Sequence, residues 1–263
     1  MKNLYQTIYG FVNPYLLRIN YQKISEPNMS GAGYVDIEAV AKRYNKVNED
    51  IGKSELLKNS AVRDAVYFLE KDCIDHSEDF RKVGKVLDIG CGTGIYSKIF
   101  RKINIFGNNF KYIGTEINQI FVDICKKKNP KENFVVSYAD KINFKDNYFD
   151  LVYCSSTIHY TLNKWKESLN EMARISNKFV VMVRFPLTKF NKTFYVHQRV
   201  SSLDGVENHY FIVVNRNDFE KYLEKIGLQI IKRDYSSEEY IIDGVGEKII
   251  LTQYLLKKVG SKK

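Results

Sequence analysis

A glycine-rich turn between a strand pattern and a helix pattern carries the residues whose types and spacing could bind a ligand. Residues 87–94 read LDIGCGTG, so Asp88 ends a β-branched run and glycines follow at 90, 92 and 94. Glycine lets the backbone turn tightly and lets a ligand approach without a Cβ in the way. The N-terminus of the next helix offers unpaired N–H groups to a polar ligand. These residues predict a ligand-binding turn.

Two acids flank this turn in an informative order. Asp88 lies before the glycines, and Glu116 ends the next β-type run, one β–α–β step later. Asp88 can accept a hydrogen bond from a cationic amine, and an acid at the position of Glu116 can take both hydroxyls of a ribose. Taken alone, Asp88 could be a helix cap and Glu116 a solvated loop acid. Their order around the turn favours a nucleoside-like ligand.

The glycine spacing separates this turn from two other nucleotide-binding loops. A dinucleotide fingerprint has the form Gly-x-Gly-x-x-Gly, but Ile95 stands here where its third glycine would be. No Gly-Lys-Ser/Thr follows, which excludes a Walker loop.

The same residues resemble motif I of the class I S-adenosylmethionine (SAM)-dependent methyltransferases. Residues 113–117 are similar to motif II, Ala139-Asp140 to the following acidic motif, and residues 149–152 with 155–156 to motif IV. The resemblance covers residues 83–185 well and the last two strands in outline. It implies SAM as the cofactor, bound by Asp88, Gly90, Cys91, Gly92, Thr93, Gly94, Glu116, Ile117, Asp140 and Ser155.

The resemblance also assigns parts of SAM to particular residues. It implies that the three glycines lie against the cofactor, Asp88 near its amino-acid part, Glu116 on the ribose and Asp140 by the adenine amino group.

Strands and helices alternate from residue 83 onward, as the positioning of such a turn requires. Helical patterns are expected at 95–103, 119–128, 164–175 and 217–226. Strands are expected at 85–89, 110–116, 133–140, 148–155, 179–185, 228–233 and 248–256. The predicted fold class is α/β, a Rossmann-like, seven-stranded, mostly parallel sheet with an antiparallel last strand.

The chain of 263 residues fits one such domain with an extension. We expect a methyltransferase domain at 81–263, an acceptor-side insertion at 186–214, and an N-terminal helical extension or lid at 1–80.

Histidines past the fourth and fifth strands are candidates for catalysis. An open α/β sheet binds its ligands at the carboxyl ends of its strands, and a hydroxyl acceptor needs a base. His159 is the first candidate base, although a histidine packed in the loop would fit equally; His197 and His209 in the insertion are further candidates. Candidate acceptor-binding residues are Tyr160, Arg184, Tyr195, Gln198 and Arg199. Arg184 would suit an anionic acceptor or pair with an acid.

The residues after the fourth strand disfavour several acceptors. Residues 154–157 read CSST, without the Asn/Asp-Pro-Pro-Tyr/Phe turn of amino-methylating enzymes or the Pro-Cys of cytosine-C5 enzymes. No RNA-binding motif is appended, and a net charge of +10 permits an acidic partner without selecting one. We expect the protein to O-methylate a small molecule or glycan rather than a nucleic acid. The alternatives are a SAM-binding partner subunit without catalysis and an RNA methyltransferase.

A fainter resemblance points to polysaccharide biosynthesis. Residues 184–186 (RFP), residues 195–198 (YVHQ) and the tract from 33 to 44 are similar to methyltransferases associated with bacterial surface-polysaccharide clusters. This likeness implies sugar O-methylation or a related glycan acceptor.

The cysteines and the N-terminus bear on compartment and partners. None of the 4 cysteines forms a CxxC pair, so we expect no metal site and buried thiols in a reducing compartment, the cytoplasm. Gly10 and Pro14 interrupt residues 1–20, so the apolar runs there are too short for a membrane span. These residues also lack a signal-peptide core. They are expected to pack on the domain or on a second subunit of a homodimer; peripheral contact with a membrane is the alternative.

Overall fold

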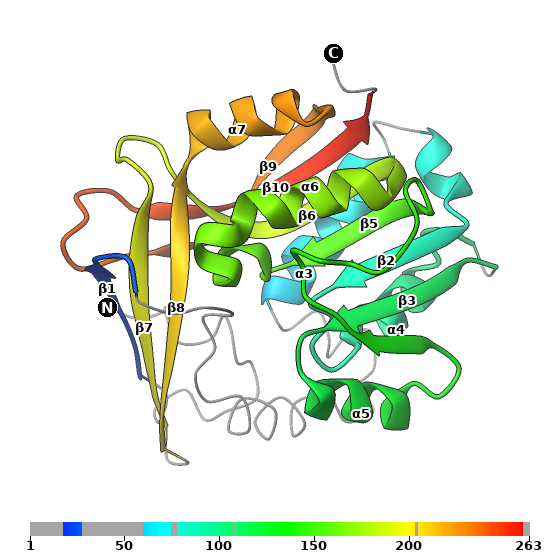
Figure 1. Cartoon of the computed structure of the whole chain (residues 1–263), viewed down its shortest axis with the longest axis horizontal. Helices are drawn as coiled ribbons and strands as arrows, with labels where there is room; N and C mark the ends of the chain where they lie inside the picture. The colour runs from blue at the N-terminus through cyan, green and yellow to red at the C-terminus, as the bar shows by residue number, and fades with distance from the viewer. Residues whose placement is uncertain (1–17, 28–59, 75–77, 108, 203–204, 260–263) are drawn as a thin grey trace.

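The computed structural model describes residues 18–27, 60–74, 78–107, 109–202 and 205–259 (Figure 1). The expectations for residues 1–17 and for the tract from 33 to 44 lie outside these ranges. All four cysteines are described, and each is a buried free thiol. Among the described residues, no helix combines the length and the apolar character needed to cross a bilayer.

Seven strands form the central sheet, in the order β4-β3-β2-β5-β6-β10-β9. The sheet is parallel except for β10, which runs antiparallel to both β6 and β9. This confirms the predicted mostly parallel sheet with an antiparallel last strand. The strands are β2 (Lys85–Ile89), β3 (Lys111–Glu116), β4 (Asn133–Val136), β5 (Phe149–Ser155), β6 (Ser176–Thr188), β9 (Leu228–Tyr240) and β10 (Ile249–Lys258).

Helices cover both faces of the sheet, and each face has its own apolar cluster. One cluster joins the sheet to α3 (Ser60–Tyr67), η1 (Phe68–Cys73), η2 (Glu78–Lys82), α4 (Ile95–Ile103) and α5 (Gln119–Lys128). The other joins it to η3 (Ile158–Lys164), α6 (Trp165–Ile175) and α7 (Arg216–Lys225). In Figure 1, α6 lies on the viewer's side of β5 and β6. Strands buried between two helical layers explain the nearly continuous apolar runs of β5 and β6.

Three further strands extend the sheet beyond β6. β7 (Phe194–Ser202) and β8 (Gly205–Asn215) form an antiparallel hairpin, and β1 (Arg18–Ile24) pairs antiparallel with β7. The hairpin reaches the central sheet where Leu187 and Thr188 pair with Val214 and Asn215. It extends to the left of the sheet in Figure 1. The expected insertion at 186–214 is therefore largely a strand hairpin.

The strand β1 corrects the expectation that residues 1–80 are helical. Residues 18–24 read RINYQKI, in which Tyr21 is buried and its neighbours Asn20 and Gln22 are exposed. This alternation fits a strand, and pairing with β7 satisfies backbone groups of an edge that would otherwise be open. The prediction was wrong here because the partner strand is distant in sequence. The remaining domain boundaries stay predictions.

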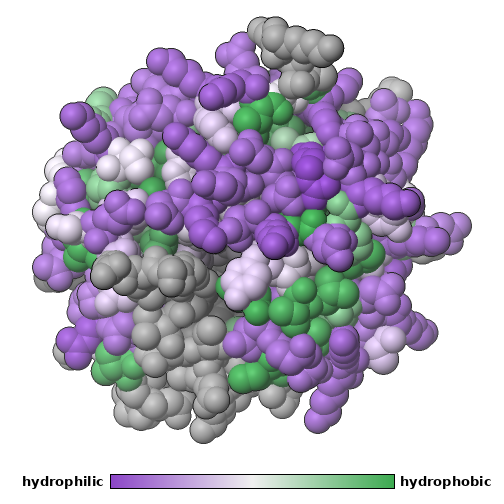
Figure 2. All heavy atoms as spheres, viewed as in Figure 1, coloured by the Kyte–Doolittle hydropathy of each residue, from purple (hydrophilic) through white to green (hydrophobic). Residues whose placement is uncertain are grey.

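The visible surface is mostly hydrophilic, with an apolar area at the lower right of the view (Figure 2). On the edge strand β4, Val135 and Val136 are exposed apolar residues. A mostly hydrophilic surface agrees with a basic chain whose lysines are spread along the sequence.

Phe211 joins the hairpin to the rest of the molecule, so its truncation tests the packing. It is 1% exposed, and its ring lies against those of Tyr21 in β1, Tyr240 in β9 and His159 in η3. We expect Phe211→Ala to lower the free energy of unfolding in urea by about 3–5 kcal/mol, because a cavity remains. Phe190→Ala, at a residue 76% exposed, should change it by less than about 0.5 kcal/mol. Equal effects of the two substitutions would contradict this packing.

Candidate functional site

The three glycines of the turn have left-handed backbone angles but different surroundings. A Cβ on Gly90 would lie 2.3 Å from the Thr157 side chain, and one on Gly94 would lie 2.9 Å from Asn129 Nδ2. A Cβ on Gly92 would meet no atom within 4 Å. Gly90 and Gly94 therefore allow close packing. Gly92 leaves an open approach to the backbone, as a bound ligand requires.

Asp88 is a buried acid with one oxygen unaccounted for. It is 1% exposed, and the Tyr112 hydroxyl donates to its Oδ2 at 2.6 Å. Its Oδ1 is buried without a hydrogen-bond partner in the described part of the chain. Burial raises the pKa of Asp88 to about 7, partly opposed by the hydrogen bond from Tyr112. A cationic amine would supply the missing donor and stabilise the charged form.

Glu116 joins the end of β3 to the glycine turn. Its Oε2 accepts from the backbone N–H of Gly92 at 3.0 Å, and its Oε1 accepts from that of Ile117 at 2.8 Å. Burial raises the pKa of this carboxyl, and the backbone donors offset part of the rise. The acid therefore lies beside Gly92, the glycine of the turn whose approach is open. Both carboxylates and Gly92 lie at the carboxyl edge of β2 and β3.

The other residues that the resemblance assigned to SAM lie around this centre in different ways. Cys91 is buried in the apolar cluster, so only its backbone can face a ligand, and Thr93 is also buried. Ser155 Oγ lies 3.0 Å from the hydroxyl of Tyr96, in the first turn of α4. Asp140 is half-buried, and its Oδ2 accepts from Lys164 Nζ at 2.7 Å.

Four acceptor-side candidates gather between η3 and the hairpin. His159 and Tyr160 lie in η3, and Gln198 and His209 are cross-strand partners on one face of β7 and β8. We call the face that carries Gln198 and His209 the inner face. The Tyr160 hydroxyl donates to Gln198 Oε1 at 3.3 Å. Sequence reasoning missed Glu207, whose Oε2 lies 3.2 Å from His209 Nε2 on this face.

His159 differs electrostatically from an effective general base. It is 2% exposed, and its Nδ1 has no hydrogen-bond partner among the described residues. Burial, with a smaller effect from the charge of Arg184, lowers the pKa of His159 to about 3. The neutral imidazole can accept a hydrogen bond, but it is a poor proton acceptor near neutral pH.

Three other candidates lie on the opposite face of the hairpin. Tyr195, His197 and Arg199 alternate with the buried residues of β7, so their side chains point away from the inner face. His197 Nε2 lies 2.9 Å from Asn208 Oδ1, and its ring stacks on Tyr210. The structure therefore separates these three residues from Gln198 and His209.

Arg184 lies in a buried polar network. Two residues of β6, Val183 and Arg184, face the single residue Gln253 of β10, and Arg184 has a φ of 62° in this bulge. Its Nη2 donates to Glu238 Oε2 at 2.5 Å and its Nε to Ser156 Oγ at 3.0 Å. Of the two roles considered for Arg184, pairing with an acid is the one observed.

The network continues to the helix α3. Arg184 Nη1 lies 3.5 Å from Ser236 Oγ, which donates to Asp64 Oδ2 at 2.6 Å. The sequence carried no clear signal for Glu238 and Ser236, because polar residues alternating along a strand are also typical of a solvent-facing edge.

The comparisons with known proteins agree with this arrangement. Residues 87–179, less than half of the chain, match the family described as "Methyltransferase domain". A malonyl-[acyl-carrier protein] O-methyltransferase of Buchnera aphidicola is 24% identical over 67% of this chain and 65% of its own length. An uncharacterised protein of Methanocaldococcus jannaschii is 29% identical over 49% of this chain and 52% of its own. The chain thus spans less than two thirds of either curated relative.

Solved structures show the same fold. A SAM-dependent methyltransferase of Clostridium acetobutylicum has a TM-score of 0.55 at 14% identity, covering 86% of this chain and 98% of that one. Magnesium protoporphyrin IX methyltransferase of Synechocystis, with bound SAM, has a TM-score of 0.52 at 15% identity, covering 82% and 90%.

The chain has the fold of the SAM-dependent methyltransferases. The match of residues 87–179 to the methyltransferase-domain family agrees with the resemblance seen in the glycine turn.

The buried Asp88 predicts how stability depends on pH without ligand. Its pKa is about 7 in the fold against 3.8 ordinarily, so its contribution to stability is lost as pH rises from about 4 through 7. We expect the protein to lose a few kcal/mol of unfolding free energy between pH 5 and pH 8, and Asp88→Asn to flatten this trend. Calorimetric melting at several pH values measures it. Asp123→Asn, at an exposed residue of α5, should keep the wild-type slope; an equally steep slope in Asp88→Asn would refute the assignment.

Proposed function

We propose that this chain binds SAM and transfers its methyl group to a hydroxyl of a small molecule or glycan. The observation that carries the proposal is the meeting of Gly92, open to approach, with the buried Asp88 and the half-buried Glu116 at one sheet edge. The unpartnered Asp88 oxygen fits the ammonium of an amino-acid group. The Glu116 carboxylate, next to the open glycine, fits a ribose. The residues present therefore suit SAM.

Bound SAM supplies an electrophilic methyl group on a sulfonium. In the proposal, Asp88 orients the amino-acid part, Glu116 holds the ribose hydroxyls and Asp140 contacts the adenine. Gly90 and Gly94 shape the turn, while Cys91 and Thr93 contribute backbone groups. Ser155 lies within hydrogen-bonding distance of Tyr96 at the end of β5, and the proposal assigns it to the side toward the acceptor. Methyl transfer then depends chiefly on alignment of the acceptor atom with the methyl group.

The inner face of the hairpin is the proposed acceptor side. The carboxylate of Glu207 beside His209 can stabilise the imidazolium that forms when the imidazole takes a hydroxyl proton. The low pKa of His159 makes it a poor proton acceptor, so His159 is assigned a hydrogen bond to the acceptor. Tyr160 and Gln198, which are hydrogen-bonded to each other, would orient the acceptor hydroxyls.

The comparisons support O-methylation in general terms. The Buchnera relative is named an O-methyltransferase, and the polar groups Gln198, Glu207 and His209 on the inner face suit an acceptor with hydroxyls. We propose a polysaccharide precursor as the acceptor, methylated in the cytoplasm. The support is the short resemblance at residues 184–186 and 195–198.

A SAM-binding subunit without catalysis is the second candidate. A Haloferax volcanii methyltransferase of this fold, with a TM-score of 0.50 at 13% identity, was solved in complex with the Trm112 methyltransferase activator. That complex gives a precedent for a partnered protein of this fold. A partner subunit would bind SAM without transferring its methyl group.

Gly92→Ala tests the donor site. Alanine there enters open space, at a backbone cost of about 1–2 kcal/mol for the left-handed angle. We expect calorimetric affinity for SAM and its demethylated product S-adenosylhomocysteine to fall at least about tenfold. Gly107→Ala is the matched control, since Gly107 also has a left-handed angle and open surroundings. Equal affinities in both variants would remove the glycine assignment, and a wild-type protein that binds neither compound would end the proposal.

His209→Gln tests the acceptor side. With isotopically methyl-labelled SAM and extracts divided into small-molecule, glycan and RNA fractions, we expect alkali-stable labelled methyl ethers in the first two. His209→Gln should lower the rate by about 100-fold or more, the range for loss of a general base. His197→Gln, on the opposite face of the same hairpin, should keep most activity. Label in RNA alone would replace the proposed acceptor, and SAM binding without any labelled product would favour the partner subunit.

A further inference from the structure

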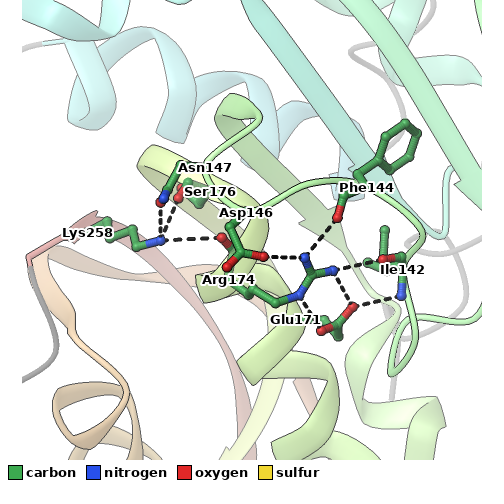
Figure 3. Close-up of polar contacts among 8 residues, drawn as sticks. All are labelled: Ile142, Phe144, Asp146, Asn147, Glu171, Arg174, Ser176 and Lys258. Carbon is green, nitrogen blue, oxygen red and sulfur yellow. Dashed lines mark hydrogen bonds and ion pairs between the residues drawn. The ribbon is translucent and has the colours of Figure 1, made fainter.

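The connection between β4 and β5 carries Asp140 and is held by the helix α6. Asp140 lies near the start of this connection, which ends where β5 begins at Phe149. The connection is contacted next to each end of α6. Lys164, immediately before α6, donates to Asp140 Oδ2. Arg174, in the last turn of α6, donates to residues further along the connection (Figure 3).

Arg174 uses all of its side-chain donor groups in this clamp. Its Nη1 donates to the carbonyl of Phe144 at 2.8 Å and to Asp146 Oδ1 at 2.7 Å. Its Nη2 donates to the carbonyl of Ile142 at 2.8 Å and to Glu171 Oε2 at 2.8 Å, and its Nε donates to Glu171 Oε1 at 2.7 Å. A planar guanidinium can satisfy these diverging acceptors together, whereas an ammonium cannot reproduce the same fork.

Ile142 is held from both sides of its backbone. Glu171 Oε2 accepts from the Ile142 N–H at 2.8 Å, while Arg174 binds the Ile142 carbonyl. The Ile142 side chain is buried in the apolar cluster below α6. Arg174 lowers the pKa of Glu171 by their hydrogen bond, so the acceptor stays charged. The residue two positions after Asp140 is therefore fixed in place.

The far end of the connection has a separate anchor. Lys258, at the end of β10, donates to Asn147 Oδ1 at 2.5 Å and to the carbonyl of Ser176 at 2.9 Å (Figure 3). The Asn147 N–H donates to the carbonyl of Arg174 at 2.9 Å. The Arg174 side chain therefore anchors the part of the connection nearer Asp140, and Lys258 anchors the part nearer β5.

We propose that Arg174 and Glu171 are positioning residues that fix Asp140 for recognition of the adenine amino group. The inference rests on the proposed function and deepens it. The two residues touch neither the glycine turn nor the acids Asp88 and Glu116 in the described contacts. Their loss therefore weakens discrimination of the base, while the binding of the ribose and amino-acid parts persists.

Two ligands that differ only at the base separate this role from a general effect. The probes are S-adenosylhomocysteine and S-inosylhomocysteine, in which a carbonyl replaces the adenine amino group. Calorimetry, by competition where binding is weak, gives the ratio of their affinities. Wild type should prefer the adenine compound by about tenfold or more, the scale of a charge-assisted hydrogen bond.

Arg174→Met keeps the aliphatic stem and removes every donor. We expect it to reduce the preference at least about threefold while affinity for the inosine compound stays within about twofold. Asp140→Asn should reduce the preference similarly, and Arg174→Lys should restore it only in part. Arg233→Gln is the matched control, since Arg233 forms a comparable half-exposed pair with Glu220 at 2.7 Å; it should leave the preference unchanged.

The outcomes distinguish the inference from the proposed function. If wild type binds neither compound, the proposed function itself fails. If wild type binds both and Arg174→Met keeps the full preference, or weakens both compounds equally, the positioning role is overturned. Melting temperatures of all variants establish that each remains folded at the assay temperature.

Discussion

The placement of the buried Asp88 and the half-buried Glu116 at the ends of adjacent strands is the constraint on which the candidate ligand-binding edge depends. Asp88 and Glu116 both have raised pKa values because burial disfavours their charged forms. Tyr112 and two backbone N–H groups offset only part of that cost. The edge is therefore electrostatically incomplete on its own, and a ligand with a cationic amine and hydroxyl donors would complete it. The glycine turn is shaped to let such a ligand come close.

The acceptor side is linked to this edge through the turn after β5. Arg184 holds Ser156 from a bulge in β6, and the next residue, Thr157, packs against Gly90. Left-handed backbone at a non-glycine residue costs energy and persists where surrounding contacts determine it. Here the ion pair with Glu238 and the bond to Ser156 do so. The geometry of the glycine turn and that of the hairpin side are thus fixed by neighbouring parts of one polar network.

Local patterns predicted the parts of the fold that local physics determines. The bounds of α4 and α5 agree with expectation, because apolar period and flanking glycine or asparagine residues mark their ends. The glycine turn and Glu116 were found for the same reason. β1 was missed, and Tyr195, His197 and Arg199 were grouped with Gln198, because strand pairing and the choice of face depend on distant partners. The pairing of Arg184 with Glu238 was equally invisible, since it joins residues far apart in the chain.

The hairpin meets the central sheet through only two residue pairs, Leu187 with Val214 and Thr188 with Asn215. The rest of its backbone pairing is internal or with β1. Side chains of the inner face also contact η3 and β9, as Gln198 does with Tyr160 and Phe211 with Tyr240. Under the proposed function, replacement of Gln198, Glu207 or His209 could change the acceptor while the edge of β2 and β3 kept the donor. In evolutionary terms, the proposal separates inheritance of the donor from divergence of the acceptor.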